Sequence, residues 1–355
     1  MDFVPIIKPV GGSCNLNCLY CYFQKRKISK SNKLITEKNL LKRFIDNTCS
    51  IQERTEFIWH GGEPLLSGLE FYHNAIELQS KWAKMGKKIY NSIQTNGTLV
   101  NQKWIDFFTE NNFATGVSLD GPAEFHNKSR GKFEQTIKAI QLLKEANVIS
   151  DVICCVSTIN CKYPEKIFDF FKEKKIKKIK FLQVQGRNKN GDLLPYSVNS
   201  LQYADFLIKI FKKWIKTDDP EIEIREIKSI VNLMLGGDFR ECMFAGECYK
   251  YFTVYPDGSI YGCDSFPKIK SLYFGHIDQN LTEIELSINF KRFKQKLKKI
   301  QQKCKSCYWF KICRGGCPQD WHPDIFKKNP ENAYCSGLQK IFSTIQKTLK
   351  EFKMI

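Results

Sequence analysis

The chain has 355 residues, 42% of them hydrophobic, which is enough for one large α/β domain with a smaller appendage. No apolar run approaches the length of about 18 residues that a membrane span needs, and the opening MDFVPIIKPV lacks the pattern of a signal peptide. We therefore expect a cytoplasmic protein with no membrane partner. In a reducing compartment, fifteen cysteines indicate metal ligation or catalysis rather than disulfides.

The formal net charge is +19, with lysine-dense stretches at residues 172–180 and 291–305. Such stretches can contact RNA or an acidic partner. No RNA-binding signature accompanies them, so we interpret them as solvated helix faces and expect no nucleic-acid partner.

The first predicted strand, residues 3–9, runs into the segment GGSCNLNCLYCYF at 11–23. This segment places Cys14, Cys18 and Cys21 in a CxxxCxxC array. At helical pitch the three thiols would share one face, so three buried cysteines on an amphipathic helix are the structural alternative. The glycines and asparagines around them are poor helix formers and favour a loop. Three thiolates in a loop suit an iron–sulfur cluster or zinc, although both normally take four ligands.

Strands and helices then alternate along the chain. Strands are predicted at residues 3–9, 56–59, 88–93, 114–119, 152–157 and 177–184, and helices at 36–47, 69–85, 104–110, 133–146 and 164–173. This alternation predicts a parallel α/β sheet or barrel, with its active site at the carboxyl ends of the strands. The segments HGGEP, QTNG and SLDGP all fall at such ends.

HGGEP, residues 60–64, has two glycines that let the backbone approach a ligand closely and a proline that keeps the loop from becoming helix. An ordinary Gly-Gly turn after a strand is the alternative. Asn96, Ser118 and Arg130 lie on later strand ends or loops. Of these, Arg130 suits a carboxylate, because a guanidinium can bond both of its oxygens.

The cysteine array, with the aromatic Tyr20 just before its third cysteine, resembles the signature of radical S-adenosylmethionine (SAM) enzymes. The resemblance implies an open, partial (β/α)6 barrel. It also implies that Cys14, Cys18 and Cys21 hold a [4Fe–4S] cluster with one iron left open for SAM. GGEP resembles the family segment that holds the SAM amino group. The expected SAM contacts are Tyr20, His60, Gly61, Gly62, Glu63, Asn96, Ser118 and Arg130.

Residues 201–235 are expected to be mostly helical, interrupted around 216–220, after which cysteines become dense. We place the first domain at 1–236, a cysteine-rich domain at 237–340 and a C-terminal helix at 341–355. Eight cysteines follow the boundary: Cys242, Cys248, Cys263, Cys304, Cys307, Cys313, Cys317 and Cys335. Two zinc sites or two iron–sulfur clusters both satisfy that count. We expect the remaining cysteines to be small buried hydrophobic residues: Cys49, Cys154, Cys155 and Cys161.

The Cx9Gx4C pattern of Cys248, Gly258 and Cys263, followed by Cx2Cx5Cx3C and a last cysteine, resembles the SPASM domain found behind radical SAM cores that modify peptides and proteins. The resemblance implies two auxiliary [4Fe–4S] clusters, and so three clusters in all. One would be held by Cys242, Cys248, Cys263 and Cys317, and the other by Cys304, Cys307, Cys313 and Cys335.

Residues 251–255 and 259–263 are predicted to form a hairpin around Pro-Asp-Gly, with Asp264 at its end. A turn or cap role for Asp264 is the structural alternative. The segments GGEPLLSGLEFY, NSIQTNGTL, VSLDGPAEFHNKSR and KSCYWFKICRGGC resemble the anaerobic sulfatase-maturating enzymes. That resemblance implies that Asp264 is the catalytic base and that His60 and Phe23 border the site. The Phe23 position is often tyrosine in relatives.

The implied reaction converts a cysteine or serine of an unfolded sulfatase segment to Cα-formylglycine under anaerobic conditions. A 5′-deoxyadenosyl radical would abstract a Cβ hydrogen, and the auxiliary clusters would accept the second electron. A low-potential donor such as ferredoxin or flavodoxin is the expected redox partner. The alternative within the same fold is a maturase that forms a thioether, a carbon–carbon crosslink or an epimer in a ribosomal peptide. A zinc-ribbon or RNA-binding interaction protein is the alternative from another class.

Overall fold

The computed structural model describes residues 3–25, 38–188, 190–239, 241–266, 268–322, 326–327 and 329–355. Its main feature is a ten-stranded sheet in the order β10-β9-β8-β1-β2-β3-β4-β5-β6-β7. The strands of the first part are β1 (Val4–Ile7), β2 (Arg54–Trp59), β3 (Lys88–Thr95), β4 (Ala114–Ser118), β5 (Ile149–Val156), β6 (Lys178–Gln183) and β7 (Glu223–Ile224). Neighbours from β1 to β7 all pair in parallel. The predicted partial parallel barrel is therefore confirmed, with the two-residue β7 as an unforeseen addition.

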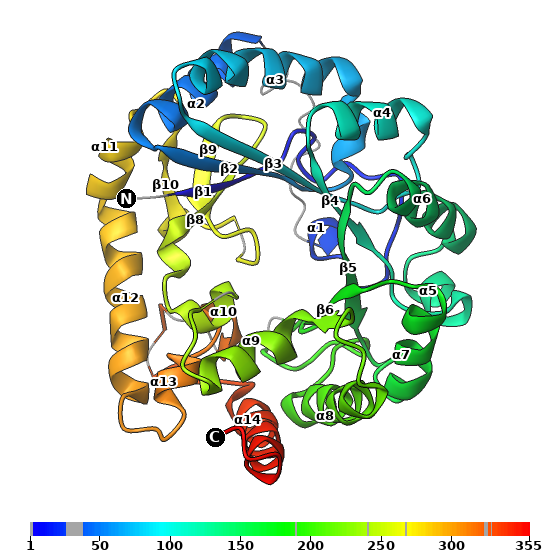
Figure 1. Cartoon of the computed structure of the whole chain (residues 1–355). Coiled ribbons are helices and arrows are strands. Elements are labelled where there is room, and N and C mark those ends of the chain that lie inside the picture. Colours follow the sequence, from blue (N-terminus) through cyan, green and yellow to red (C-terminus); the bar gives the residue numbers. More distant parts are fainter. Residues whose placement is uncertain are drawn as a thin grey trace.

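Helices cover the outer face of the curved sheet, and the short helix α1 (Tyr22–Lys25) lies inside it (Figure 1). The outer helices are α2 (Lys38–Ile51), α3 (Leu69–Lys84), α4 (Gln102–Glu110), α5 (Ala123–Ser129), α6 (Phe133–Glu145), α7 (Pro164–Glu173) and α8 (Ser200–Thr217). Helix α9 (Arg225–Met234) follows β7 and lies between β6 and α10 in Figure 1. The first two residues of the helix expected at 36–47 lie outside the described residues. The remaining predicted helices of this part are confirmed within a few residues at each end.

Alternating burial fixes the sheet against these helices. Phe57 and Trp59 on β2 are completely buried, and Trp59 meets the rings of Phe71 and Tyr72 on α3 edge to face. Such pairs add to the stabilisation that comes from burying their area. The opposite side of the strand is therefore left to face the interior of the barrel.

The hairpin of the second part joins the same sheet. Strand β8 (Tyr251–Val254) pairs in parallel with β1, from Val4 opposite Tyr251 to Ile7 opposite Val254. Strands β9 (Ser259–Gly262) and β10 (Tyr273–His276) continue the sheet antiparallel. The predicted hairpin is confirmed, and the sheet is continuous across residue 236, where the domain boundary remains a prediction.

Short elements and two long helices complete the second part. They are α10 (Cys242–Ala245), η2 (Cys248–Lys250), η3 (Lys270–Leu272), α11 (Leu281–Leu286), α12 (Ile288–Cys304), α13 (Phe310–Cys313), η4 (Pro318–Asp320), β11 (Trp321–His322), β12 (Glu331–Asn332) and α14 (Cys335–Glu351). The first part also contains one short helix, η1 (Pro64–Ser67). Among the described residues, no helix is long and apolar enough to cross a membrane.

The C-terminal helix begins earlier than its expected start at residue 341, because α14 already includes Cys335. Its first turn contains Gly337, which is normally unfavourable in a helix. A Cβ at this glycine would lie only 2.3 Å from the backbone oxygen of Ser200. The glycine therefore lets α14 pack closely against the start of α8.

Candidate active site

The loop that carries the first three cysteines connects β1 to α1, as predicted. Backbone hydrogen bonds fasten it to the HGGEP loop: the Gly62 N–H donates to the Gly11 oxygen at 2.9 Å, and the Glu63 N–H donates to the Ser13 oxygen at 2.8 Å. A Cβ on Gly62 would lie 1.8 Å from that Ser13 oxygen. This glycine is therefore required by the contact between the two loops.

The three thiols of this loop lie close enough for their charges to interact. Burial raises the pKa of Cys14, and burial also raises that of Cys18 to about 11, with Cys21 adding to both shifts. The Asn96 amide donates to the Cys14 sulfur at 3.7 Å. Buried soft donors whose charges repel one another fit an iron–sulfur cluster, because bound iron compensates the thiolate charge.

Glu63 is completely buried behind this loop. It accepts hydrogen bonds from the Thr95 hydroxyl at 2.7 Å and the Asn96 N–H at 2.8 Å. Burial raises the pKa of Glu63 to about 7, although these hydrogen bonds oppose the shift. Glu63 thus ties the end of β3 to the end of β2, next to the thiols.

Tyr20 and Arg130 both converge on Asp120, which is completely buried at the end of β4. The Tyr20 hydroxyl donates to Asp120, and the Arg130 guanidinium lies 3.1 Å from the same carboxylate and 5.3 Å from the Tyr20 ring. Arg130 therefore already has a carboxylate partner within the chain. Ser118 is the last residue of β4 and accepts a hydrogen bond from Gln94 at 3.1 Å.

A second group of side chains surrounds Asp264. The Lys8 ammonium lies 2.7 Å from its Oδ2, and the Tyr22 hydroxyl donates to the same oxygen at 3.0 Å. The Lys8 side chain has no exposed surface, and that of Asp264 has 14%. Burial alone would raise the pKa of Asp264, but Lys8, His60 and Tyr22 together hold it below its usual range.

His60 also lies beside the Lys8 ammonium, with its Nδ1 3.7 Å from the Asp264 Oδ2. Its Nδ1 accepts a hydrogen bond from the Gly61 N–H at 2.7 Å and lies 3.1 Å from the Lys8 nitrogen. Burial and then the Lys8 charge lower the pKa of His60 to about 4, although its side chain keeps 30% of its surface accessible. A neutral ring that accepts at Nδ1 carries its proton on Nε2. Phe23 closes this group, with the Lys8 nitrogen 4.6 Å from its ring.

The eight later cysteines lie in two groups of four in the structure. In the first, a hydrogen bond between Cys248 and Cys263 raises the pKa of Cys248 and lowers that of Cys263, while Cys242 and Cys317 act on Cys248 through their charges. In the second, the charges of Cys304, Cys307 and Cys335 act on Cys313, whose pKa burial raises to about 12.

Those two groups fit soft metal clusters by the chemistry of their donors. No three or more His, Cys, Asp or Glu side chains in the described part of the chain converge as the ligands of a single metal ion.

The four cysteines left outside these groups are mostly packing residues. Cys49, Cys154 and Cys161 are buried, as expected. Cys155 is only half-buried, and its sulfur accepts a hydrogen bond from Arg130 at 3.3 Å. Its role is therefore not purely apolar.

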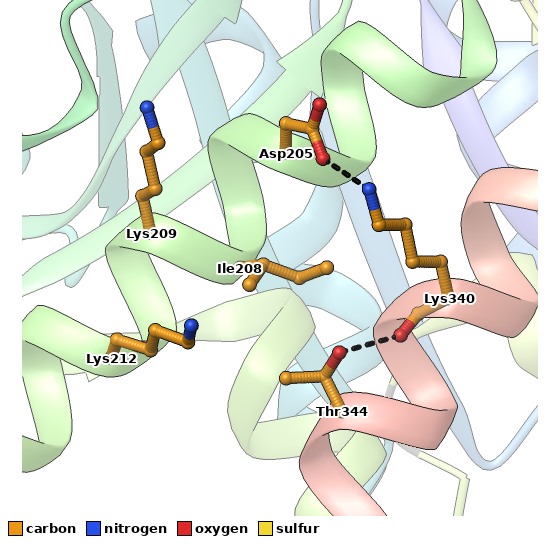
Figure 2. A pocket seen from close by; sticks show the side chains of 6 residues that line it. All are labelled: Asp205, Ile208, Lys209, Lys212, Lys340 and Thr344. Atoms are coloured by element: carbon orange, nitrogen blue, oxygen red, sulfur yellow. Dashed lines mark hydrogen bonds and ion pairs between the residues drawn. The ribbon is translucent and has the colours of Figure 1, made fainter.

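A groove on the surface lies between α8 and α14, and its lining includes no predicted site residue (Figure 2). Lys340 there pairs with Asp205 at 2.6 Å, and the Thr344 hydroxyl donates to the Lys340 backbone oxygen at 2.8 Å. Because its charged pair is satisfied within the groove, we attach no chemistry to it.

Lys8, Tyr22 and Asp120 are the site residues that sequence reasoning missed. Lys8 had a signal, because it is a single charge at the end of the apolar run FVPII. A fully buried lysine almost always has a partner. Asp120 stands in the SLDGP segment, which was noted only for its position.

Comparisons with known proteins agree with this geometry. The family model described as "Radical SAM superfamily" matches residues 9–171, and the one described as "Iron-sulfur cluster-binding domain" (SPASM) matches residues 242–308. The chain is 31% identical to a cysteine-type anaerobic sulfatase-maturating enzyme of Clostridium novyi, covering 95% of this chain and 93% of that protein. It is 35% identical to a serine-type enzyme of Bacteroides thetaiotaomicron, covering 96% and 88%.

Among solved structures, the chain resembles native anSMEcpe with bound AdoMet and Cp18Cys peptide, with a TM-score of 0.89, 29% identity and 98% of each chain covered. Streptococcus suis SuiB bound to S-adenosylmethionine shares the fold alone, with a TM-score of 0.62 and 15% identity over 90% of this chain and 74% of that one. The match over almost the whole length unites the parallel barrel, the cysteine loop and the hairpin in one known architecture. The chain is a radical SAM protein-modifying enzyme and belongs to the family of anaerobic sulfatase-maturating enzymes.

Proposed function

We propose that this enzyme converts a cysteine or serine side chain of a target sulfatase to Cα-formylglycine. The observation that carries the proposal is the Asp264 carboxylate, which Lys8 and Tyr22 hold inside the barrel at 2.7 Å and 3.0 Å. An ionised carboxylate with fixed orientation is suited to accept the proton of a substrate thiol or hydroxyl. The similarity to both cysteine-type and serine-type relatives supports the same reaction class.

The cofactor set we propose is SAM and three [4Fe–4S] clusters. Cys14, Cys18 and Cys21 would hold the cluster that leaves one iron for SAM, near the HGGEP loop, Asn96, Ser118 and Arg130. The two groups of four cysteines in the second part would hold the auxiliary clusters. Asn96 supports the first assignment, because its amide bonds both the Cys14 sulfur and the Asn15 side chain at 2.9 Å.

SAM bound there supplies, on one-electron reduction, the radical chemistry that removes a hydrogen atom from the substrate Cβ. The residues of this chain orient the substrate and handle its proton. Asp264 takes the thiol or hydroxyl proton, and Lys8 keeps the carboxylate ionised before that transfer. Phe23, with the ring of Tyr22 4.3 Å away, presents apolar surface beside the carboxylate and helps to exclude water.

The test is anaerobic reconstitution followed by incubation with a sulfatase-motif peptide and mass spectrometry. Formylglycine formation removes about 18 Da from a cysteine peptide or about 2 Da from a serine peptide, by atom counting on this two-electron oxidation. Release of deoxyadenosine with no such product would favour the peptide-maturase alternative.

Asp264→Asn should reduce product formation by about 100-fold or more, since positioned general bases contribute about 10²–10⁴. The matched control is Asp257→Asn, which changes an aspartate of the same hairpin that pairs with Lys268 at 3.0 Å instead. Unchanged product formation by Asp264→Asn would remove this residue from the mechanism.

A further inference from the structure

Residues 288–317 form a segment that contains ten lysines and arginines and no aspartate or glutamate. The segment comprises α12, α13 and the turns around them, and α12 occupies one side of the molecule in Figure 1. Four of the candidate cluster ligands lie within this segment, namely Cys304, Cys307, Cys313 and Cys317. We call this segment the basic segment.

Seven of the ten cations of the basic segment are exposed to solvent. On α12, Phe290, Phe293, Leu297 and Ile300 are buried against the hairpin sheet. The exposed positions of the basic segment include Lys291, Arg292, Lys298, Lys299, Lys303, Lys305 and Lys311. No ion pair among the described residues involves any of these seven.

The other lysine-rich stretch, residues 172–180, is different. There Lys174, Lys177 and Lys180 pair with Glu173, Glu221 and Glu241 at 3.0, 2.6 and 2.7 Å. Three of its six lysines are thus paired within the molecule. The charge of the basic segment is left for a partner, and an unneutralised field of one sign attracts a partner of the opposite sign.

The location of the basic segment selects the kind of partner. The thiol group of Cys304, Cys307, Cys313 and Cys335 lies at this surface, with Cys335 exposed and the other three half-buried. Tyr308, next to Cys307, is 73% exposed and offers an aromatic contact among the cations. An apolar centre with a charged surround is the usual anatomy of a protein interface.

We propose that the basic segment is the docking surface for an acidic one-electron carrier protein, which exchanges electrons with the cluster at Cys304, Cys307, Cys313 and Cys335. This inference rests on the proposed function, because it assumes that these thiols hold an iron–sulfur cluster. When the enzyme is the electron donor, the cluster loses one electron, and the oxidised flavin or iron–sulfur centre of the carrier gains that electron. No other reactant is needed. Redox encounters of this kind bury little area and depend strongly on charge.

The test compares two triple variants of the reconstituted holoenzyme. Lys298→Gln, Lys299→Gln and Lys305→Gln together remove three charges from the basic segment. The control carries Lys209→Gln, Lys212→Gln and Lys216→Gln, which removes three charges from the exposed face of α8. Glutamine keeps a helix propensity close to that of lysine, so both variants should fold.

The probe is a purified, oxidised flavodoxin of negative net charge, and its Kd is measured calorimetrically at low and moderate salt. At low salt we expect the basic-segment variant to bind about tenfold more weakly and the α8 control to differ by less than about twofold, since exposed charge pairs contribute 0.2–1 kcal/mol each. The wild-type Kd should rise with salt more steeply than that of the basic-segment variant.

A second measurement is the rate at which flavodoxin reoxidises the reduced enzyme, which should fall in the same variant. Equal weakening by both variants, or no flavodoxin binding at all, would overturn the proposal. So would a single-stranded RNA that binds through the same lysines more tightly than flavodoxin. Formylglycine formation with a chemical reductant is assayed separately, so failure of the docking surface and failure of the proposed function give different results.

Discussion

The pair formed by Lys8 and Asp264 gives the sharpest quantitative prediction. Lys8→Met leaves the Asp264 carboxylate largely buried, with the Tyr22 hydroxyl still donating to it. Asp264→Asn leaves the fully buried Lys8 ammonium beside a neutral His60. Removing one partner of a buried pair costs about 3–5 kcal/mol of stability. We expect the first change near the lower end of that range and the second near the upper end.

The double variant should cost much less than the two single variants added together, because it removes both members of the pair and leaves neither buried without the other. We expect a coupling energy of about 2 kcal/mol or more between the two positions. The control cycle uses Lys213→Met and Asp169→Asn, an ion pair of 2.5 Å between α8 and α7 whose side chains are 30% and 58% exposed. That pair should couple by less than about 1 kcal/mol.

Unfolding of the reconstituted protein in urea, followed anaerobically by tryptophan fluorescence, measures both cycles. Cluster absorbance is recorded in parallel, so that loss of iron is not mistaken for loss of the ion pair. Additive effects at Lys8 and Asp264, within about 0.5 kcal/mol, would refute the reasoning.

Three further predictions use other parts of the site. Gly62→Ala should lower the iron content by about four atoms per chain, because its Cβ meets the cysteine loop. The control Gly86→Ala strains the backbone at φ +90 but places its Cβ in open space away from the cysteines, so it should leave the iron content unchanged. Tyr22→Phe should cost about 1.5–3 kcal/mol, the range for a hydrogen bond to a charged group, and a urea midpoint equal to that of the wild type would contradict the Tyr22–Asp264 bond. Glu226 is buried on α9, and this burial raises its pKa from 4.5 to about 7. The free energy of unfolding should therefore fall by about 3 kcal/mol as the pH rises through this interval. Glu226→Gln should raise the thermal midpoint at pH 8 and leave it unchanged at pH 4.5.

Local patterns were sufficient for most of the fold. The apolar periodicity of α7 and the turn residues after β3 depend on neighbours a few positions away, and both predictions were confirmed. The cysteine loop was also predictable, because the glycines around it disfavour helix. The start of α14 was not, because Gly337 acts through its contact with α8 rather than through local propensity.

The surroundings of Asp264 were beyond such patterns. Lys8 and Asp264 are 256 positions apart in the chain. They meet because β8 pairs with β1 and the chain after β9 then turns toward the end of β1, where the Lys8 N–H donates to the Val254 oxygen at 2.9 Å. No local hydrophobic periodicity in the sequence predicts the pairing of β8 with β1. The spacing of the cysteines did identify the second domain, and with it the hairpin, but not the partner of its aspartate.

The same geometry bears on the expectation, drawn from the family resemblance, that a phenol often stands at the position of Phe23. In this chain the Phe23 ring contacts the Lys8 ammonium, while the preceding residue, Tyr22, begins α1 and reaches Asp264 with its hydroxyl. A phenol thus lies beside the carboxylate in this chain, but it comes from Tyr22 and is already bonded to Asp264. Because that hydroxyl is occupied, we expect it to orient the proposed base instead of binding the substrate side chain, which would then meet the apolar ring of Phe23. We therefore expect substrate orientation at this site to depend on packing against Phe23 more than on a hydrogen bond.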